Sequence, residues 1–278
     1  MKADIFYTSA AGRFLLLALQ KTGLFRLAAW ALGTRASKPL IRRYIEKNGI
    51  NMSSFKGQSF GSFSEFFSRK KDISFDPDPD AVISPCDSLL SVYAISDGLC
   101  IPIKGSEYSV CDLVPDEDEA EKFRNGLCLV FRLEASDYHH FCCIDSGRTI
   151  KSGYVPGILH SVQPIAMRSV PVFRLNRRWW SVLETDHLGT VAQTEIGAVL
   201  VGRVSFFTDD GHFLRGQDMG TFEIAGSTIV LMLTEDVRKR LELRNDIAEA
   251  CDEGRETRVS IGTAIGSLAP LNRTEIGL

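Results

Sequence analysis

Three short stretches of the sequence carry side chains suited to covalent or acid–base chemistry, and they centre on Asp87, His139 and Ser227. Asp87 lies in the stretch SPCDS, directly before an apolar run. A carboxylate at such a turn most often accepts hydrogen bonds from backbone N–H groups. Taken alone, Asp87 is therefore predicted to have a structural role.

The second stretch, DYHHFCC, contains the adjacent residues His139 and His140. Neighbours in an extended segment point to opposite faces, so at most one of the two faces any single site. That histidine is either a base working near neutral pH or a hydrogen-bonded side chain in a buried, aromatic-rich strand. A zinc site needs three or four ligands, and Cys142 with one histidine supplies too few, so no metal is expected.

The third stretch, GTFEIAGSTIV, contains Gly226 and Ser227. By default, Gly-Ser-Thr between two apolar runs is a turn joining two strands. The stretch does not match the G-x-S-x-G motif of a nucleophile elbow, which disfavours a conventional α/β-hydrolase. Because Gly226 has no side chain, the Ser227 hydroxyl can reach back to the Gly226 carbonyl with little steric hindrance.

The elements that must position these residues are mostly strands, since short Val-, Ile-, Phe- and Tyr-rich runs alternate with turn residues. The predicted strands are Leu90–Ile95, Cys128–Leu133, Arg148–Val155, Trp180–Thr185, Gly189–Val204 (one bent strand or two), Gly220–Ile224 and Thr228–Leu233. We expect a turn or linker at 76–80, an acidic surface loop at Pro115–Glu121 and a helix over Glu235–Asp252. With helices before it, this β-rich region predicts an α+β fold.

Residues 1–50 differ from the rest in charge, with nine basic side chains against two acidic ones, a net charge of +7. Their apolar runs are too short for a spanning helix and predict amphipathic helices at about 10–33 and 37–48. Such helices lie in a lipid interface or pack on the protein's own core. The charge excess favours an anionic membrane surface.

The whole chain has 278 residues, 44% of them hydrophobic and 24% charged, with a net charge of −3. This composition is that of an ordinary globular protein, and its charge gives no reason to expect nucleic-acid binding. Seven cysteines, an odd number with no C-x-x-C pair, predict reduced and mostly buried thiols in a cytoplasmic protein.

Together the three stretches resemble the phosphatidylserine decarboxylase family, in which Asp, His and Gly-Ser follow in this order. The matching motifs run over almost the whole chain: FSEFFSRK (63–70), SPCD (84–87), DYH (137–139), PVF leading to Asn176 (171–176), EIGA (195–198), RGQDMG (215–220) and GST (226–228). Each motif is weak alone, whereas seven in order are specific. The resemblance implies a β-rich catalytic domain, sandwich- or barrel-like, over residues 51–278 and membrane-associating helices over residues 1–50.

The resemblance also implies a mechanism of self-cleavage. Ser227 attacks the Gly226 carbonyl, with His139 as the base and Asp87 as the residue that orients it. Elimination and hydrolysis then leave a large chain, 1–226, and a small chain, 227–278, that begins with a pyruvoyl group in place of Ser227. This cofactor forms a Schiff base with phosphatidylserine and accepts electrons as carbon dioxide leaves, giving phosphatidylethanolamine.

The partners implied are a phospholipid substrate and an anionic membrane surface, with the two chains remaining associated and a homodimer as a further possibility. The protein is expected to be peripheral, on the cytoplasmic face of a membrane, the bacterial cell membrane if the source is prokaryotic. Many family members have a second histidine where this chain has Cys142. Either that second histidine is dispensable, or Cys142, His140 or an ordered water takes its part in protonating the product.

Three alternatives remain from the sequence. A pyruvoyl decarboxylase of a soluble amino acid would share the site but need no lipid surface. A non-catalytic β domain could keep the fold, although it would be free to lose Asp87, His139 or Ser227, and all three are present. A serine hydrolase would require Ser227 to survive as a hydroxyl.

Overall fold

The centre of the molecule is an antiparallel sheet of eight strands, seen in a computed structural model that describes residues 7, 9–96, 98–103, 106–198, 203–208, 211–224 and 227–270. In spatial order its strands are β11 (His212–Phe213), β7 (Gly147–Val155), β8 (Arg178–Thr185), β9 (Gly189–Ile196), β13 (Thr228–Leu233), β5 (Leu127–Arg132), β2 (Ser88–Ala94) and β15 (Thr257–Val259). Side chains alternate across it. Along β13, Ile229 and Leu231 enter one apolar core, while Val230 and Met232 enter a second core on the opposite face.

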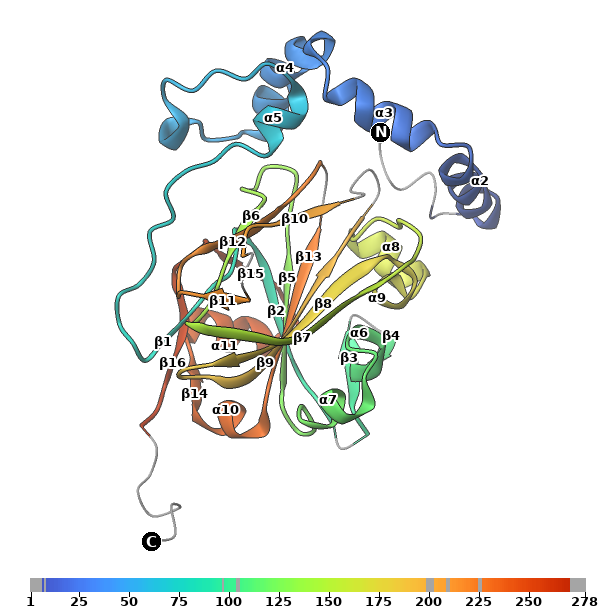
Figure 1. The fold of residues 1–278 in the computed structure, drawn as a ribbon. Helices are drawn as coiled ribbons and strands as arrows, with labels where there is room; N and C mark the ends of the chain where they lie inside the picture. Colours follow the sequence, from blue (N-terminus) through green and yellow to red (C-terminus); the bar gives the residue numbers. More distant parts are fainter. Residues whose placement is uncertain are drawn as a thin grey trace, which may run out of the picture.

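Two three-stranded sheets lie beside the large one (Figure 1). One has the order β10 (Val204–Phe206), β12 (Asp218–Phe222), β6 (His140–Cys142), and the other β1 (Ala81–Ile83), β16 (Ala264–Leu268), β14 (Leu241–Leu243). A hairpin, β3 (Cys100–Ile103) and β4 (Ser106–Ser109), and the short helices α6 (Val110–Leu113), α8 (Pro164–Ser169) and α9 (Val172–Leu175) supply residues to the second core. The predicted α+β class is confirmed.

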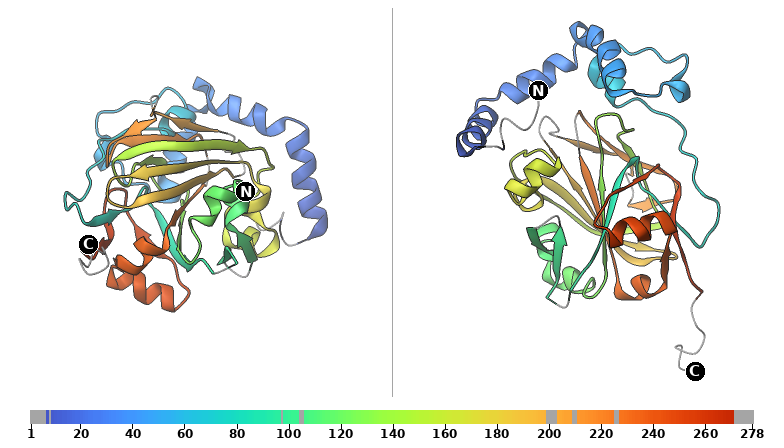
Figure 2. Two further views of the ribbon diagram at one scale, coloured as in Figure 1. Left: turned by 60° about the horizontal axis from the view of Figure 1, so that its bottom comes forward. Right: turned by 180° about the vertical axis from the view of Figure 1, so that it is seen from behind.

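The N-terminal helices form an arc across one end of the sheets, as both views from the side show (Figures 1 and 2). They are α2 (Ala10–Lys21), α3 (Leu24–Leu32), α4 (Lys38–Asn48) and α5 (Phe63–Phe67). The single helix predicted at 10–33 is wrong. Gly23, at φ 75°, ends α2 and starts α3 at an angle of 68°, because the left-handed backbone it adopts cannot continue a helix.

Helix α3 has no fully buried side chain, although Phe25 packs partly buried against the second core and Leu32 against the apolar cluster that contains Phe66. Other large apolar side chains of α3 face outward, with Trp30 68% exposed and Leu27 59% exposed. Over the residues that the structure describes, no single helix has the length and apolarity to cross a bilayer. Residues 14–21 of α2, taken together with the whole of α3, have the required length and apolarity, but only as a pair of helices with a bend between them.

Two further predictions are corrected. The helix expected at Glu235–Asp252 is interrupted: α10 (Glu235–Arg240) and α11 (Asn245–Asp252) flank β14, whose backbone pairs with β16. Sheet pairing there outweighs the helical spacing of the leucines. The loop expected at Pro115–Glu121 instead forms α7 (Glu117–Glu121), because Asp116 caps its first turn by accepting from the Glu119 N–H.

The predicted strands are all present to within two residues at each end, apart from Gly189–Val204. That segment contains β9 and the start of β10, with residues 199–202 between them outside the described part of the chain.

Candidate active site

The segments that carry Asp87 and Ser227 meet at one end of the large sheet. Asp87 directly precedes β2 and Ser227 directly precedes β13, and both strands pair with β5, which lies between them. Arg132, the last residue of β5, is opposite Leu89 on one side and Thr228 on the other. The N–H of Leu133 then donates to the Ser227 carbonyl at 2.9 Å. The register of three adjacent strands thus places both residues at the same edge.

His139 reaches this edge from the loop that follows β5. Its carbonyl accepts from the Phe222 N–H at 3.0 Å and from the Thr221 hydroxyl at 3.2 Å. Both donors belong to β12, the strand from which the chain runs on to Ser227. The three predicted residues therefore come from separate segments to one end of the sheet, although no hydrogen bond joins their side chains in the described part of the chain.

Ser227 is fully buried, and its hydroxyl has no hydrogen-bond partner among the described residues. An unpaired buried hydroxyl costs free energy, so native structures keep few of them, and each calls for an explanation. The predicted cleavage partner, Gly226, lies outside the described residues together with Ala225. The orphaned hydroxyl fits the group from which a pyruvoyl cofactor would be made.

The His139 imidazole is also fully buried and neither ring nitrogen has a hydrogen-bond partner among the described residues. Its ring stacks on Phe67, with centroids 4.2 Å apart. Burial, and secondly the positive charge of Arg69, lower the pKa of His139 to about 3. The imidazole is therefore neutral at physiological pH, with a lone pair available to accept a proton.

Arg69 is an unusual neighbour, because it is only 4% exposed. Its guanidinium lies 4.8 Å from the ring centroids of both Phe55 and Phe66 and donates to the Phe66 carbonyl at 3.3 Å. Cation–π contacts of this kind offset part of the cost of burying a charge. This buried cation opposes protonation of His139.

The Asp87 carboxylate accepts from a backbone N–H, but the donor is the distant Ile261, at 2.8 Å, and not a residue of its own turn. The ammonium group of Lys71 lies 3.8 Å from the other oxygen of Asp87. Asp87 thus makes a backbone contact in this structure rather than one with His139.

His140 faces a different environment from His139, as the sequence predicts. Its Nδ1 lies 3.0 Å from a carboxylate oxygen of Asp218 and its Nε2 3.2 Å from the Ser68 carbonyl. Both partners of the ring are hydrogen-bond acceptors. His140 also stacks face to face on Tyr138 and lines a cavity of about 1020 Å³.

Cys142 occupies the first apolar core instead of that cavity. Its thiol points to the Ser84 carbonyl at 3.8 Å. Burial raises the pKa of Cys142 to about 12, so the thiol stays protonated. No three His, Cys, Asp or Glu side chains of the described residues are grouped to hold a metal ion.

Comparisons with known proteins identify the family. A family model described as phosphatidylserine decarboxylase matches residues 60–267. The chain belongs to the phosphatidylserine decarboxylase family. It is 38% identical over 264 residues to phosphatidylserine decarboxylase proenzyme 2 of Clostridium acetobutylicum, covering 94% of this chain and 89% of the relative. The proenzymes of Clostridium kluyveri and Desulfitobacterium hafniense are each 34% identical over 269 residues, covering 94% of this chain and 90% and 89% of theirs.

The sequence analysis of this phosphatidylserine decarboxylase family member did not single out one buried acid, Glu195, as a site candidate. Glu195 in β9 is 1% exposed and lies opposite Ile229 of β13. Ser227 is two residues before Ile229 and so faces the same side of the sheet. The Gln193 amide donates to the Glu195 carboxylate at 2.6 Å. Burial raises the pKa of Glu195 to about 7. The available signal was an acid within an otherwise uncharged strand, inside the EIGA motif.

Proposed function

We propose that this protein is a phosphatidylserine decarboxylase proenzyme that cuts itself between Gly226 and Ser227. The observation that carries the proposal is the fully buried Ser227 hydroxyl, which has no hydrogen-bond partner in the described part of the chain and lies at the sheet edge where the His139 and Asp87 segments also arrive. Membership of the family supports it.

In the proposed self-cleavage, neutral His139 takes the proton of the Ser227 hydroxyl, and the oxygen attacks the Gly226 carbonyl carbon. The peptide C–N bond breaks, leaving an ester and a protonated amine on residue 227. Removal of the α-proton of residue 227 then expels the Gly226 carboxylate. Hydrolysis of the remaining unsaturated residue releases ammonia and leaves a pyruvoyl group. Asp87 orients His139 in this scheme, which requires a change of rotamer because Asp87 accepts from Ile261 here.

The pyruvoyl carbonyl, once formed, would supply the electron sink for loss of carbon dioxide from a serine headgroup. The chain's own contribution is a proton for the product. We assign that proton to His140, because both its nitrogens face acceptors and its ring lines the cavity. Cys142 is the weaker candidate, since it lies in the core and holds its proton tightly.

The lipid substrate is favoured over a soluble amino acid by the surface of the N-terminal arc. Phe14, Leu27 and Trp30 expose large apolar side chains there, within a segment that carries a net charge of +7. Exposed apolar side chains among cations are typical of helices that lie in an anionic lipid interface. The proposed location is accordingly the surface of a membrane, as a peripheral protein.

An intact mass spectrum of the purified protein tests the proposal. We expect two chains that match residues 1–226 and 227–278, the smaller lighter by the mass of ammonia. Ser227→Ala should remain a single chain, and His139→Ala should be cut slowly or not at all. The matched control, His187→Gln, alters a histidine outside the site and should be cut normally. Normal cutting of Ser227→Ala would refute the proposal.

The substrate is tested separately, on the cut protein. Phosphatidylserine with cyanoborohydride should leave an adduct on the small chain, and free serine under the same conditions should leave far less. An adduct on a lysine would argue against a pyruvoyl centre. Equal reaction of serine and the lipid, without association with anionic vesicles, would favour the soluble substrate.

A further inference from the structure

The cavity of about 1020 Å³ lies between the N-terminal arc and the small sheet that contains β12. Arginines at 26, 177 and 203 line it, from α3, the segment before β8 and the segment before β10. Lys70 adds a further cation to the lining, and His140 also lines the cavity. Its volume is at the upper end of the range of about 300–1,000 Å³ that is usual for small-molecule sites.

Among the described residues, the acidic residues on the wall form no ion pair with Arg26 or Arg203. Glu65 accepts from the Gly61 N–H at 2.6 Å, and Glu223 accepts from the Ser205 hydroxyl at 3.0 Å. Lys70, in contrast, forms an ion pair, since its ammonium lies 3.2 Å from an Asp218 carboxylate oxygen. A net positive wall rich in arginine suits a phosphate group, because the planar guanidinium matches phosphate oxygens.

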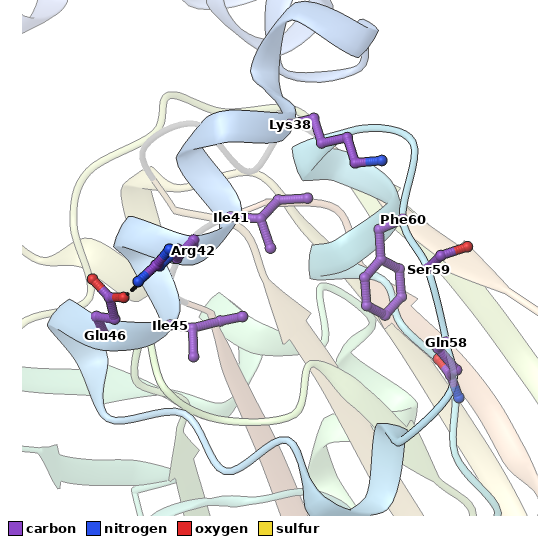
Figure 3. Close-up of a pocket in the computed structure, with 8 residues that line it drawn as sticks. All are labelled: Lys38, Ile41, Arg42, Ile45, Glu46, Gln58, Ser59 and Phe60. Carbon is purple, nitrogen blue, oxygen red and sulfur yellow. Dashed lines mark hydrogen bonds and ion pairs between the residues drawn. The ribbon is translucent and has the colours of Figure 1, made fainter.

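A second hollow shows what distinguishes this cavity. It lies between α4 and residues 58–60, has a volume of about 370 Å³ and an apolar floor of Ile41, Ile45 and Phe60 (Figure 3). The arginine of this hollow, Arg42, forms an ion pair at 2.8 Å with Glu46, which also lines the hollow. None of the predicted site residues lines it.

The position of the larger cavity connects the two parts of the proposed function. At one side it is lined by Thr221 and Ile224, which lie on the segment that leads to Ser227. At the other side it is lined by Arg26 and Ala29 of α3, the helix whose Trp30 is 68% exposed. A lipid with its acyl chains beside α3 would therefore extend its headgroup into the cavity, toward residue 227.

We propose that Arg26 and Arg203 bind the phosphodiester of the lipid headgroup in this cavity. This inference rests on the proposed function and assigns one part of the substrate to each side of the cavity. The phosphate occupies the arginine side, while the serine amine and carboxylate face residue 227. The ligand is the phosphodiester of a lipid, rather than free phosphate, because the cavity adjoins the exposed apolar face of α3.

Binding is tested first on uncut Ser227→Ala protein, so that it does not depend on activity. Isothermal titration with dihexanoyl phosphatidic acid, a water-soluble probe, should show Kd raised about tenfold or more by Arg203→Gln and by Arg26→Gln, since each removes a charge-assisted hydrogen bond. Arg168→Gln, which removes an exposed cation on α8, is the matched control and should bind as the parent protein does. Inorganic phosphate should bind much more weakly than the lipid probe.

Kinetics on the cut enzyme test the same residues with dihexanoyl phosphatidylserine, which removes membrane docking from the comparison. Arg26→Gln and Arg203→Gln should raise KM about tenfold or more, leave kcat within a few-fold and leave self-cleavage unchanged. Glycerophosphoserine should compete, whereas serine should not.

Unchanged Kd in both arginine variants overturns the phosphate site, even if the enzyme is active. Equal binding of inorganic phosphate and the lipid probe overturns the assignment to lipid. Absence of activity with the expected Kd changes overturns only the proposed function.

Discussion

Replacing Glu195 by glutamine tests whether the buried carboxyl of Glu195 is protonated. The neutral carboxyl and the amide have nearly the same shape, and the amide oxygen can still accept from Gln193. The substitution therefore removes little except the ability to ionise. Burial is the main cause of the raised pKa of Glu195, so the effect should depend on pH.

The sign and size follow from the two pKa values. A carboxyl whose pKa is raised in the folded state contributes stability that is fully present below the unfolded pKa and is lost as pH rises through the folded pKa. Raising the pKa of Glu195 from the ordinary 4.5 to about 7 makes its ionisation in the fold harder by about 3 kcal/mol. About 2.5 kcal/mol of this loss falls between pH 5 and pH 8.

Glu195→Gln should accordingly change the free energy of unfolding little at pH 5 and raise it by about 2–3 kcal/mol at pH 8. At pH 8 this corresponds to a rise in Tm of about 5–10 °C. Thermal and urea unfolding at the two pH values, in an uncut Ser227→Ala background, measure the effect without interference from cleavage. Glu107→Gln, on an exposed position of β4, is the control and should show no such difference. An equal effect of Glu195→Gln at both pH values would refute the reasoning.

Further substitutions test other contacts. Phe67→Leu removes the ring stacked on His139, so self-cleavage should slow several-fold in a time course on gels, and normal cutting would show that the stacking does not hold the base. Asn176→Ala removes hydrogen bonds to His160 and Gly197 and should lower the free energy of unfolding by about 2–4 kcal/mol in urea while cleavage persists. His140→Asn should leave cleavage intact and lower kcat about a hundredfold, and an unchanged kcat would remove His140 from proton donation.

The sequence predicted the strands well because each buries alternate side chains, and a two-residue period is visible without knowledge of neighbours. It failed where a distant partner decides the structure. Leu241 lies four residues after Val237, and Leu243 four residues before Ile247, which is the spacing of a helix. Residues 241–243 nevertheless form β14, because β16, more than twenty residues later, offers a free strand edge. Gly23 was overlooked as a break because nothing in its neighbourhood signals that its φ is positive.

For the site, motif order identified the segments that meet but not the contacts that their side chains make. The register of β2, β5 and β13 explains why Asp87 and Ser227 share an edge, and this register depends on pairings across the whole sheet. That Asp87 accepts from Ile261, 174 residues away, could not be read from its turn. The burial of Glu195 likewise depends on the sheets and strands around β9.

The place of β13 within the sheet has a consequence for the proposed mature enzyme. New chain ends usually fray, because a terminus has few neighbours to hold it. Here all six residues of β13 are paired with β5 on one side and with β9 on the other, and both flanking strands belong to the large chain.

The proposed small chain would also pair with the large one elsewhere, since β15 pairs with β2 and β16 pairs with β1. Dilution would therefore not separate the two proposed chains, which would behave as one molecule despite the missing covalent bond. The reactive carbonyl would sit at a chain end clamped in the middle of a sheet. Its orientation would be fixed before any substrate arrives, so that little entropy remains to be lost on reaction.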